Sequence, residues 1–444
     1  MNRLLIVVFY FQILLIVWSC IKPPPPRPPL PKPPPDTPST KFPTNLEVVW
    51  LAPWCLDSAG GDWIWNFEVA NNQYIVVANT YDSDGDRPRG IGLYNMQTGQ
   101  RHSAWQNDPG GIFAPTEFEY LRDCKTAGKN KEIILIYTGE ALFGYNLHNG
   151  QRLWTLNIKN QSITGIPRIS VERNYAFITY GPGGLLSKSW HRLAMVDVYS
   201  GKKTDILQLE IEDNYEFAIL PPSANVSDNG DILLYFTKSG LNFVENDERT
   251  YAYCYNLTKK QMLWENKQFI SDREDGDWSS HTLPPPYVIE NDKLIITCAK
   301  SIHCLNKHTG ELIWQKEGLF GISEPPLYWE GKLYIRYNNP CILLCLDAQN
   351  GQQIWENVAS KPLQAPHGRM AIYQDKLYCS ISGGNANYYL FCAYIHTGEE
   401  LWRDLGPWGH IAFDVLIDQK TGYLYCYTGW ATMCVDLNKT PKRD

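Results

Sequence analysis

Short apolar runs separated by polar turns fill most of the chain, and this pattern predicts β-strands. One phrase returns eight times: an apolar strand ending in Asn or Asp, a four-residue turn, a Gly, and a second strand that carries Trp. Leu305–Trp314 shows the phrase most clearly, with Asn306 ending the first strand and Gly310 following the turn. The positions equivalent to Asn306 are Asn95, Asn146, Asp197, Asn256, Asp347, Tyr394 and Asp436.

A second pattern lies between these phrases and consists of a Pro, an apolar strand, a turn and another strand. Residues 326–335 form one copy, and other copies surround Pro167, Pro222, Pro286 and Pro366. The two patterns together predict four antiparallel strands per repeat, and the repeats are spaced by 41 residues (306 to 347) to 59 residues (197 to 256). Such a period is typical of one propeller blade. We therefore predict an all-β fold, an eight-bladed β-propeller of four-stranded antiparallel blades.

The two ends of the repeat region complement each other. The eighth phrase stops at residues 438–440, before any outer strand, whereas residues 46–50 form an apolar strand ending in Trp50. If this N-terminal strand completes the last blade, the ring closes and two exposed sheet edges disappear. We predict that the ring is closed in this way.

The Trp of each phrase is expected to cover the seam between neighbouring blades, because its large ring buries much apolar surface while its N–H reaches a carbonyl. The blade-docking residues predicted from the repeat are Trp50, Trp154, Trp264, Trp314, Trp355 and Trp402. Gly keeps its place in six copies, with Lys260 and Thr440 the exceptions. Trp105 lies two residues late in the first copy, and Asp205 takes the Trp position in the third, so that blade is expected to pack differently.

The N-terminal residues 1–19 are typical of a signal peptide, with Arg3 followed by an apolar run from Leu4 to Trp18. The run ends at residues 17–20 in a sequence that resembles the bacterial lipobox, which predicts lipidation of Cys20, for instance with palmitate. The alternative is an uncleaved membrane anchor. Residues 20–44 form a Pro-rich linker, which is expected to be a stiff spacer, and residues 45–444 form the propeller. The protein is therefore expected outside the cytoplasm, tethered to a membrane.

Charge and cysteine content narrow the function classes. The formal net charge is −7 and the basic residues form no run, so we expect no nucleic-acid binding. Beyond Cys20 there are eleven cysteines, and three pairs flank predicted hairpins: Cys298 with Cys304, Cys379 with Cys392, and Cys426 with Cys434. Each pair is either a disulfide or two small apolar core residues.

The phrases at 305–314 and 397–402 resemble the tryptophan-docking repeat of the PQQ-like (quinoprotein-type) propellers. That family contains quinoprotein alcohol dehydrogenases and also non-enzymatic members such as BamB, an outer-membrane assembly lipoprotein. A signal peptide, a lipidated Cys and a single ring are similar to the BamB arrangement. The resemblance to the dehydrogenases would imply a vicinal Cys-Cys pair, a Ca²⁺ site and a catalytic Asp. No Cys-Cys dipeptide occurs in the chain, so neither PQQ nor another cofactor is expected.

Two sets of polar residues are candidate sites. Asp82, Asp84 and Asp86 lie close enough in sequence to present carboxylates to Ca²⁺, although we favour a solvated acidic turn. Several polar residues near the starts of inner strands are expected to line one mouth of the central channel and to contact a partner. These are Glu117, Arg168, His281, Glu324, His367 and His410.

From these patterns we expect a membrane-anchored, non-catalytic scaffold of the bacterial cell envelope, at the outer membrane, that binds a protein partner. The first alternative is an enzyme with a site at the channel mouth, either a quinoprotein-like oxidoreductase or a hydrolase. The second is a surface lipoprotein that binds glycan through loop aromatics. No residue spacing in the chain singles out a catalytic triad, which favours binding over catalysis.

Overall fold

In a computed structural model of the chain, the described residues belong to one compact unit that spans Pro34–Leu56 and Gly60–Asp444. The described ranges are 45–53, 63–81, 90–105, 123–138, 141–158, 169–180, 192–209, 215–220, 222–242, 247–272, 284–290, 292–298, 300–319, 322, 325–337, 341–360, 368–382, 388–406, 412–428 and 431–440. Nothing helical in these ranges has the length and apolar character needed to cross a membrane.

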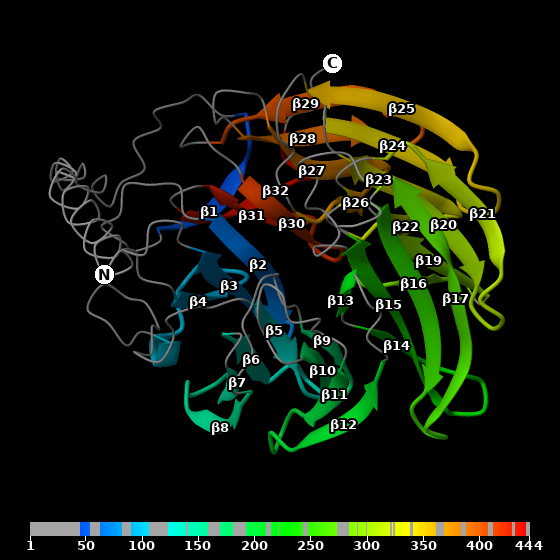
Figure 1. The fold of residues 1–444 in the computed structure, drawn as a ribbon. Helices are drawn as coiled ribbons and strands as arrows, with labels where there is room; N and C mark the ends of the chain where they lie inside the picture. The colour runs from blue at the N-terminus through cyan, green and yellow to red at the C-terminus, as the bar shows by residue number, and fades with distance from the viewer. Residues whose placement is uncertain are drawn as a thin grey trace, which may run out of the picture. The chain divides into compact units, whose positions relative to one another are not determined.

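Eight sheets follow one another around the unit in chain order, from blue to red in Figure 1. Their inner strands are β2 (Trp63–Ala70), β5 (Asp123–Ala127), β9 (Ser170–Glu172), β14 (Ser223–Val226), β18 (Tyr287–Ile289), β22 (Leu327–Trp329), β26 (Ala371–Tyr373) and β30 (Ala412–Asp418). The second strands are β3 (Tyr74–Tyr81), β6 (Ile133–Tyr137), β10 (Tyr175–Tyr180), β15 (Ile232–Asn242), β19 (Lys293–Thr297), β23 (Lys332–Tyr337), β27 (Lys376–Ser382) and β31 (Tyr423–Thr428).

The third strands are β4 (Gly90–Asn95), β7 (Ala141–Asn146), β11 (Arg192–Asp197), β16 (Asp247–Asn256), β20 (Ser301–Asn306), β24 (Cys341–Asp347), β28 (Tyr388–Tyr394) and β32 (Ala431–Asp436). The outer strands are β8 (Arg152–Asn157), β12 (Lys203–Gln208), β17 (Gln261–Asp272), β21 (Leu312–Glu317), β25 (Gln353–Ser360), β29 (Glu400–Asp404) and, in the last blade, β1 (Val48–Pro53). We number the blades one to eight from the sheet that begins with β2.

The predicted eight-bladed antiparallel propeller is confirmed, including closure by the N-terminal strand. β1 pairs with β32, with Trp50 opposite Cys434, so residues from the two ends of the propeller share blade eight. Two blades depart from four strands. Blade one has three strands and a 3₁₀ turn, η1 (Ser103–Trp105), in the outer position, because pairing ends after one bridge between Tyr94 and Arg101. Blade four has five, because β13 (Tyr215–Ile219) and β14 both pair with the long β15.

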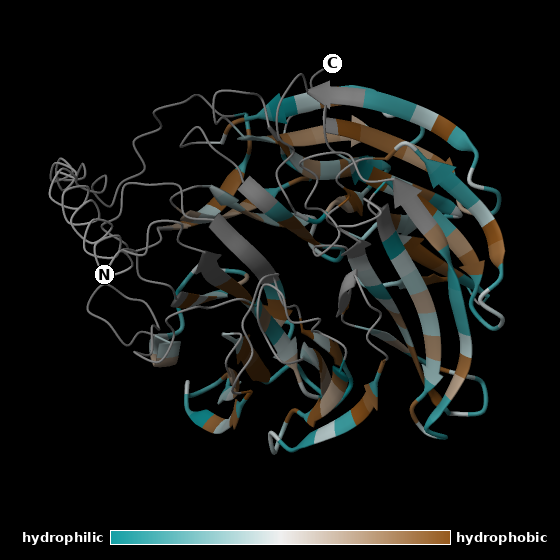
Figure 2. Ribbon diagram, viewed as in Figure 1, coloured by the Kyte–Doolittle hydropathy of each residue, from teal (hydrophilic) through white to brown (hydrophobic). Residues whose placement is uncertain are grey.

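Each blade buries its middle strands and exposes its outer strand. In blade five every residue of β20 except Asn306 is buried, whereas most of β21 is exposed. Figure 2 shows the same difference in blade six, where β24 is browner than the teal β25. The alternation of buried and exposed residues along the outer strands explains why the sequence pattern predicted them as strands.

Turns of two kinds meet at one end of every blade. The turn between the first two strands bonds to the turn after the third strand, as from Leu147 N–H to the Glu132 carbonyl (2.9 Å) and from Ala348 N–H to the Gly331 carbonyl (2.9 Å). The turn after the third strand is held by its first residue, since the Asn306 side chain accepts hydrogen bonds from His308 N–H (2.9 Å) and Thr309 N–H (3.2 Å). We call the surface formed by these turns the turn face.

Tryptophans dock six of the eight blades on the next at this turn face. Trp314 of blade five donates from Nε1 to the Ala348 carbonyl of blade six (3.1 Å), and its ring lies so close to Gly351 that a Cβ there would be 2.6 Å from the ring. Equivalent hydrogen bonds, to the residue after each Asn or Asp position, run from Trp50 to Met96, Trp105 to Leu147, Trp154 to Val198, Trp264 to Lys307 and Trp355 to Ile395. Trp402 instead packs beside Tyr378, with ring centroids 6.0 Å apart.

A β-bulge aims each docking Trp. In blade six the register shifts between Cys345 and Leu346, directly beside the pair of Cys345 with Trp355, and the same shift accompanies the other strand-borne docking residues. A bulge adds local twist and redirects a side chain. Blade three lacks the bulge at this place, and Asp205 pairs with Ala194 instead. Its carboxylate accepts hydrogen bonds from the Tyr180 hydroxyl and from Lys203 Nζ (2.8 Å), so a polar cluster replaces the Trp contact.

The cysteines are core residues beneath these tryptophans. In blade six Tyr334, Cys345 and Trp355 are paired across three adjacent strands, and the two rings approach to 5.9 Å over the small thiol. The same triad occurs as Tyr235–Cys254–Trp264, Tyr378–Cys392–Trp402 and Tyr425–Cys434–Trp50. The nine buried cysteines of the described ranges form no disulfide, so for the three predicted pairs the core alternative holds.

Candidate functional site

A network of charged side chains joins the inner strands of several blades. Glu68 on β2 accepts Lys125 Nζ from β5 at 2.9 Å and Arg369 Nη2, which lies just before β26, at 2.8 Å. Glu68 and Arg369 are 301 residues apart in sequence and belong to blades one and seven. The network therefore connects segments that only closure of the ring brings together.

Two aspartates extend this network to blades eight and three. Asp414 on β30 accepts a hydrogen bond from Arg369 N–H (2.6 Å) and lies 3.9 Å from its guanidinium. Asp123 lies 3.9 Å from Lys125 Nζ and accepts a hydrogen bond from Ile169 N–H (2.5 Å). Both aspartates are buried, and each accepts a backbone N–H from a neighbouring blade, Asp123 from blade three and Asp414 from blade seven.

The charges of the network compensate one another. Burial alone would raise the pKa of Glu68, but the positive charges of Lys125 and Arg369 outweigh it and lower this pKa to about 2. Burial likewise would lower the pKa of Lys125, while the carboxylates of Glu68 and Asp123 raise it. Glu68, Lys125 and Arg369 are therefore ionised near neutral pH. Their ion pairs join the inner strands of different blades.

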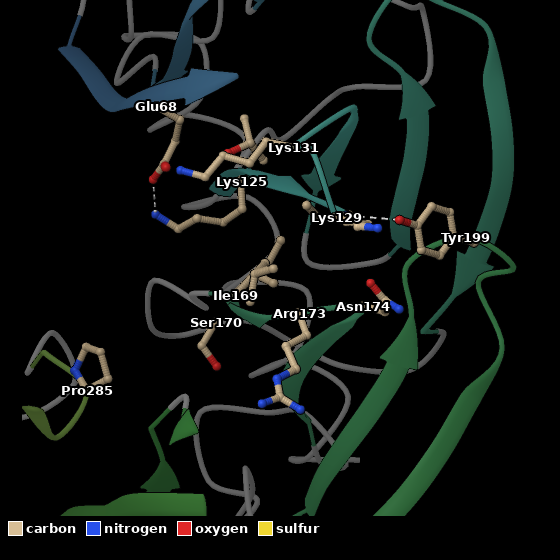
Figure 3. A pocket seen from close by; sticks show the side chains of 14 residues that line it. Glu68, Lys125, Lys129, Lys131, Ile169, Ser170, Arg173, Asn174, Tyr199 and Pro285 are labelled. Atoms are coloured by element: carbon tan, nitrogen blue, oxygen red, sulfur yellow. Dashed lines mark hydrogen bonds and ion pairs between the residues drawn. The ribbon is translucent and has the colours of Figure 1, made fainter. Parts of the chain in front are cut away.

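A pocket of about 780 Å³ lies beside this network, between blades two and three. Its wall includes the paired Lys125 and Glu68, the turn residues Lys129 and Lys131 of blade two, and Arg173 of blade three. Figure 3 shows Lys129 and Tyr199 on one side of the pocket, Pro285 on the other and Arg173 between them. Among the charged side chains of this wall the positive ones predominate, and the pocket opens among turns of the turn face.

Hydrogen bonds between two blades fix the turns around this pocket. Lys129 N–H donates to the Tyr199 hydroxyl (2.9 Å), which in turn donates to Glu132 Oε1 (3.0 Å). Lys131 and Arg173 occupy left-handed backbone positions, with φ of 54° and 55°, which few non-glycine residues adopt outside well-defined turns. The cationic side chains therefore project from a preformed surface.

A second polar pair lies inside blade five. Ser301 Oγ and His303 Nε2 are 2.7 Å apart, and both residues are buried. The Phe269 ring packs against the imidazole at 4.3 Å between centroids, and burial lowers the pKa of His303 to about 4. His303 Nδ1 has no hydrogen-bond partner in the described ranges, so no acid orients the ring as a catalytic base would require.

The channel-mouth, lipidation and acidic-turn residues predicted from the sequence are not among the described residues. Glu117, Arg168, His281, Glu324, His367 and His410 all lie outside the described residues, as do Cys20 and the acidic residues Asp82, Asp84 and Asp86. Within the described ranges no group of three or more His, Cys, Asp or Glu side chains could hold a metal ion. Sequence analysis missed Glu68, Lys125 and Arg369, whose only signal is their common place at inner strands of separate repeats.

Comparison with known proteins separates fold from function. Residues 248–405, from β16 to the end of blade seven, match the family described as outer membrane protein assembly factor BamB. No curated protein matches the chain. The crystal structure of BamB from Moraxella catarrhalis is 11% identical, with a TM-score of 0.55 over 88% of this chain and 99% of its own.

The fold is shared with enzymes as well. A europium-containing methanol dehydrogenase is 12% identical, with a TM-score of 0.58 over 88% of this chain and 86% of its own. The quinohemoprotein alcohol dehydrogenase ADHIIG from Pseudomonas putida HK5 is 13% identical, with a TM-score of 0.59 over 90% and 77%. The chain has the β-propeller fold, and its residues 248–405 match a PQQ-type family. At these identities the similarity to solved structures shows the fold alone, and activity has to be judged from the residues.

The described residues of the inner wall do not fit the quinone cofactor of the dehydrogenases. PQQ carries several carboxylates, which need uncompensated cations, whereas Lys125 and Arg369 are already paired with Glu68. The neighbouring Asp123 and Asp414 accept backbone N–H groups instead of forming a set of metal ligands. The chain also has no Cys-Cys dipeptide to lie over a quinone ring. We therefore derive no reaction through this cofactor.

Proposed function

We propose that this propeller is a non-catalytic scaffold of the cell envelope that binds a protein partner and is anchored by a lipid on Cys20. The match of residues 248–405 to the BamB assembly-factor family carries this proposal, because it covers nearly four consecutive blades. The signal-like segment 1–19 and the Pro-rich spacer 20–44 support export and tethering. A rigid ring with loops and turns on its surface suits recognition of another protein.

The charges at the inner strands support a scaffold over an enzyme. A catalytic group needs an environment that leaves it available to a substrate. Glu68, Lys125 and Arg369 are engaged with one another, and their interactions stabilise the closed ring. The Ser301–His303 pair is enclosed in the core of blade five and lacks an orienting acid in the described ranges. These groups act as structural elements in our proposal.

We further propose that partner contacts include the predicted channel-mouth residues Glu117, Arg168, His281, Glu324, His367 and His410. Photo-crosslinking in native cells tests this, with a photoreactive amino acid placed singly at these positions and, as a control, at exposed Leu263 on the outer strand of blade four. We expect one discrete protein adduct from the mouth positions and none from Leu263. The same unspecific adducts from all positions would contradict the scaffold function.

Lipid anchoring is tested separately by metabolic labelling with an alkyne-bearing palmitate. Wild-type protein should incorporate the label and fractionate with membranes, whereas Cys20→Ser should lose the label. Cys55→Ser serves as the matched control and should retain it. Equal labelling of all three proteins would contradict the anchor.

A further inference from the structure

We propose that the pocket between blades two and three binds an acidic peptide segment, a short run of Asp or Glu residues on the partner protein. This inference rests on the proposed scaffold function and names the chemistry that the partner presents.

The charge of the pocket is opposite to that of the whole chain. The formal net charge is −7, yet the described residues of the pocket wall include Lys125, Lys129, Lys131 and Arg173 and a single acid, Glu68. Lys125 and Glu68 cancel each other. Arg173 has one ion-pair contact, to Glu172 at 3.9 Å, with both side chains more than 40% exposed, and such a contact contributes little. Positive charge therefore remains available on both turns.

The nearby acid Glu132 does not remove this charge. Its carboxylate accepts hydrogen bonds from the Tyr199 hydroxyl (3.0 Å) and from Asn130 N–H (2.7 Å). These bonds hold the two turns together, and the ion pairs found among the described residues include none between Glu132 and Lys129 or Lys131. The pocket thus has a rigid, cationic rim that needs little rearrangement to receive an anion.

The remaining wall suits a peptide better than an isolated anion. Ile169, Val171 and Pro285 provide apolar surface beside the cations. Ser170 Oγ also lines the pocket and is buried without a hydrogen-bond partner in the described residues, so rotation of its hydroxyl would offer a donor to an incoming carboxylate. An acidic peptide supplies carboxylates for the rim and main-chain and apolar atoms for this wall (Figure 3).

The test uses the full lipid-anchored chain in detergent and fluorescein-labelled hexaglutamate, with hexaglutamine as the uncharged comparison, followed by fluorescence anisotropy. We expect the wild type to bind hexaglutamate and not hexaglutamine, and binding to weaken as salt screens the charges. The variant Lys129→Gln/Lys131→Gln/Arg173→Gln should lose about tenfold or more in affinity. The control Lys260→Gln/Lys420→Gln/Lys439→Gln removes the same formal charge from turns of blades four and eight and should bind within about twofold of wild type.

Three outcomes would overturn the inference: no binding of hexaglutamate by the wild type, equal weakening in both variants, or complete displacement of the peptide by equimolar inorganic phosphate, which would indicate a small-anion site. Crosslinking of the pocket variant in cells separates this inference from the scaffold function. If the wild type and the pocket variant form the same partner adduct in equal yield, the pocket is wrong and the scaffold stands. If the peptide binds as expected but no adduct forms, the scaffold is wrong.

Discussion

Replacement of Gly351 by Ala tests the docking of one blade on the next. Gly351 in blade six has a φ of 71°, and a Cβ there would lie 2.6 Å from Trp314 Cε3 and 2.7 Å from Cδ2. Gly331, in the same blade, has a φ of 75° with nothing within 4 Å of its Cβ position. The two substitutions therefore impose similar backbone strain and differ in the clash with the Trp314 ring.

The expected losses of stability follow from the backbone strain and from the clash with the Trp314 ring. A left-handed backbone costs a non-glycine residue about 1–2 kcal/mol, which is the whole expected loss for Gly331→Ala. The Trp314 ring cannot yield like a flexible chain end, and overpacking adds about 1–3 kcal/mol. Loss of the Trp314 hydrogen bond to Ala348 adds about 1 kcal/mol. We expect Gly351→Ala to destabilise the protein by about 3–6 kcal/mol.

Urea unfolding followed by tryptophan fluorescence measures both losses in the same protein. A third comparison uses Trp314→Leu as the background, in which Gly351→Ala should cost only about 1–2 kcal/mol because the ring is gone. Equal destabilisation by Gly351→Ala and Gly331→Ala would refute the proposed docking. So would an unchanged cost of Gly351→Ala in the Trp314→Leu background.

Three further predictions concern charge and packing. Glu68→Gln should lower the free energy of unfolding by about 2 kcal/mol at neutral pH, because Lys125 and Arg369 then lose the carboxylate that they share and keep only the longer contacts to Asp123 and Asp414. A loss below about 0.5 kcal/mol in urea unfolding would contradict the network. The pKa of Glu68 is lowered from 4.5 to about 2, so its contribution is present above pH 4.5 and is lost as the pH falls towards 2; acid unfolding of wild type and Glu68→Gln should converge there. The pKa of His303 is lowered from 6.5 to about 4, so the unfolded chain takes up a proton at a higher pH than the folded chain does. The free energy of unfolding should therefore fall by up to about 3 kcal/mol as the pH drops from 6.5 to 4. Thermal melts of His303→Leu should lack this pH dependence, and the same pH dependence in both proteins would refute the assignment to His303.

The sequence predicted the fold well because the determinants of a blade are local and repeated. Asn306, Gly310 and Trp314 lie within nine residues of one another, and each acts through a turn or a seam that recurs around the ring. The departures from the repeat were also visible in the sequence. Asp205 of blade three replaces the docking Trp, and Lys260 of blade four replaces the Gly that such a Trp would contact, so both lie at the seam between these two blades. Because no Trp ring packs at this seam, a Lys side chain fits in the Gly position, where the backbone of Lys260 has a φ of 54°.

The strand count of individual blades was harder to predict. The late position of Trp105 does not reveal that η1 replaces a strand. Its ring is held by a hydrogen bond to the Leu147 carbonyl, while a single bridge between Arg101 and Tyr94 is all that remains of the strand pairing. The extra strand β13 depends on the length of β15, which its apolar pattern does not fix. Propensity and alternation describe a strand but not how far its pairing continues.

The pocket and the charge network were not predicted, because their members are far apart in the sequence. Arg369 meets Glu68 only when the ring closes, and Arg173 lies across a blade seam from Lys129. Isolated Lys and Arg residues in turns have no distinguishing local pattern. The cysteines show the opposite case, since their spacing suggested hairpin disulfides. The register instead pairs one Cys of each proposed pair, Cys304, Cys392 and Cys434, with a Trp on the neighbouring strand.

The central proposal, that this propeller is a scaffold within an envelope complex, is tested most directly by the mass of the particle in which it migrates after extraction from native membranes. The protein extracted in mild detergent and separated by native electrophoresis should migrate well above its own 50.9 kDa, in a complex with the same partner in every preparation. Cys20→Ser should reduce this complex, whereas Cys55→Ser should preserve it. Migration of the wild-type protein at its own mass, together with substrate turnover by the isolated chain, would contradict the account.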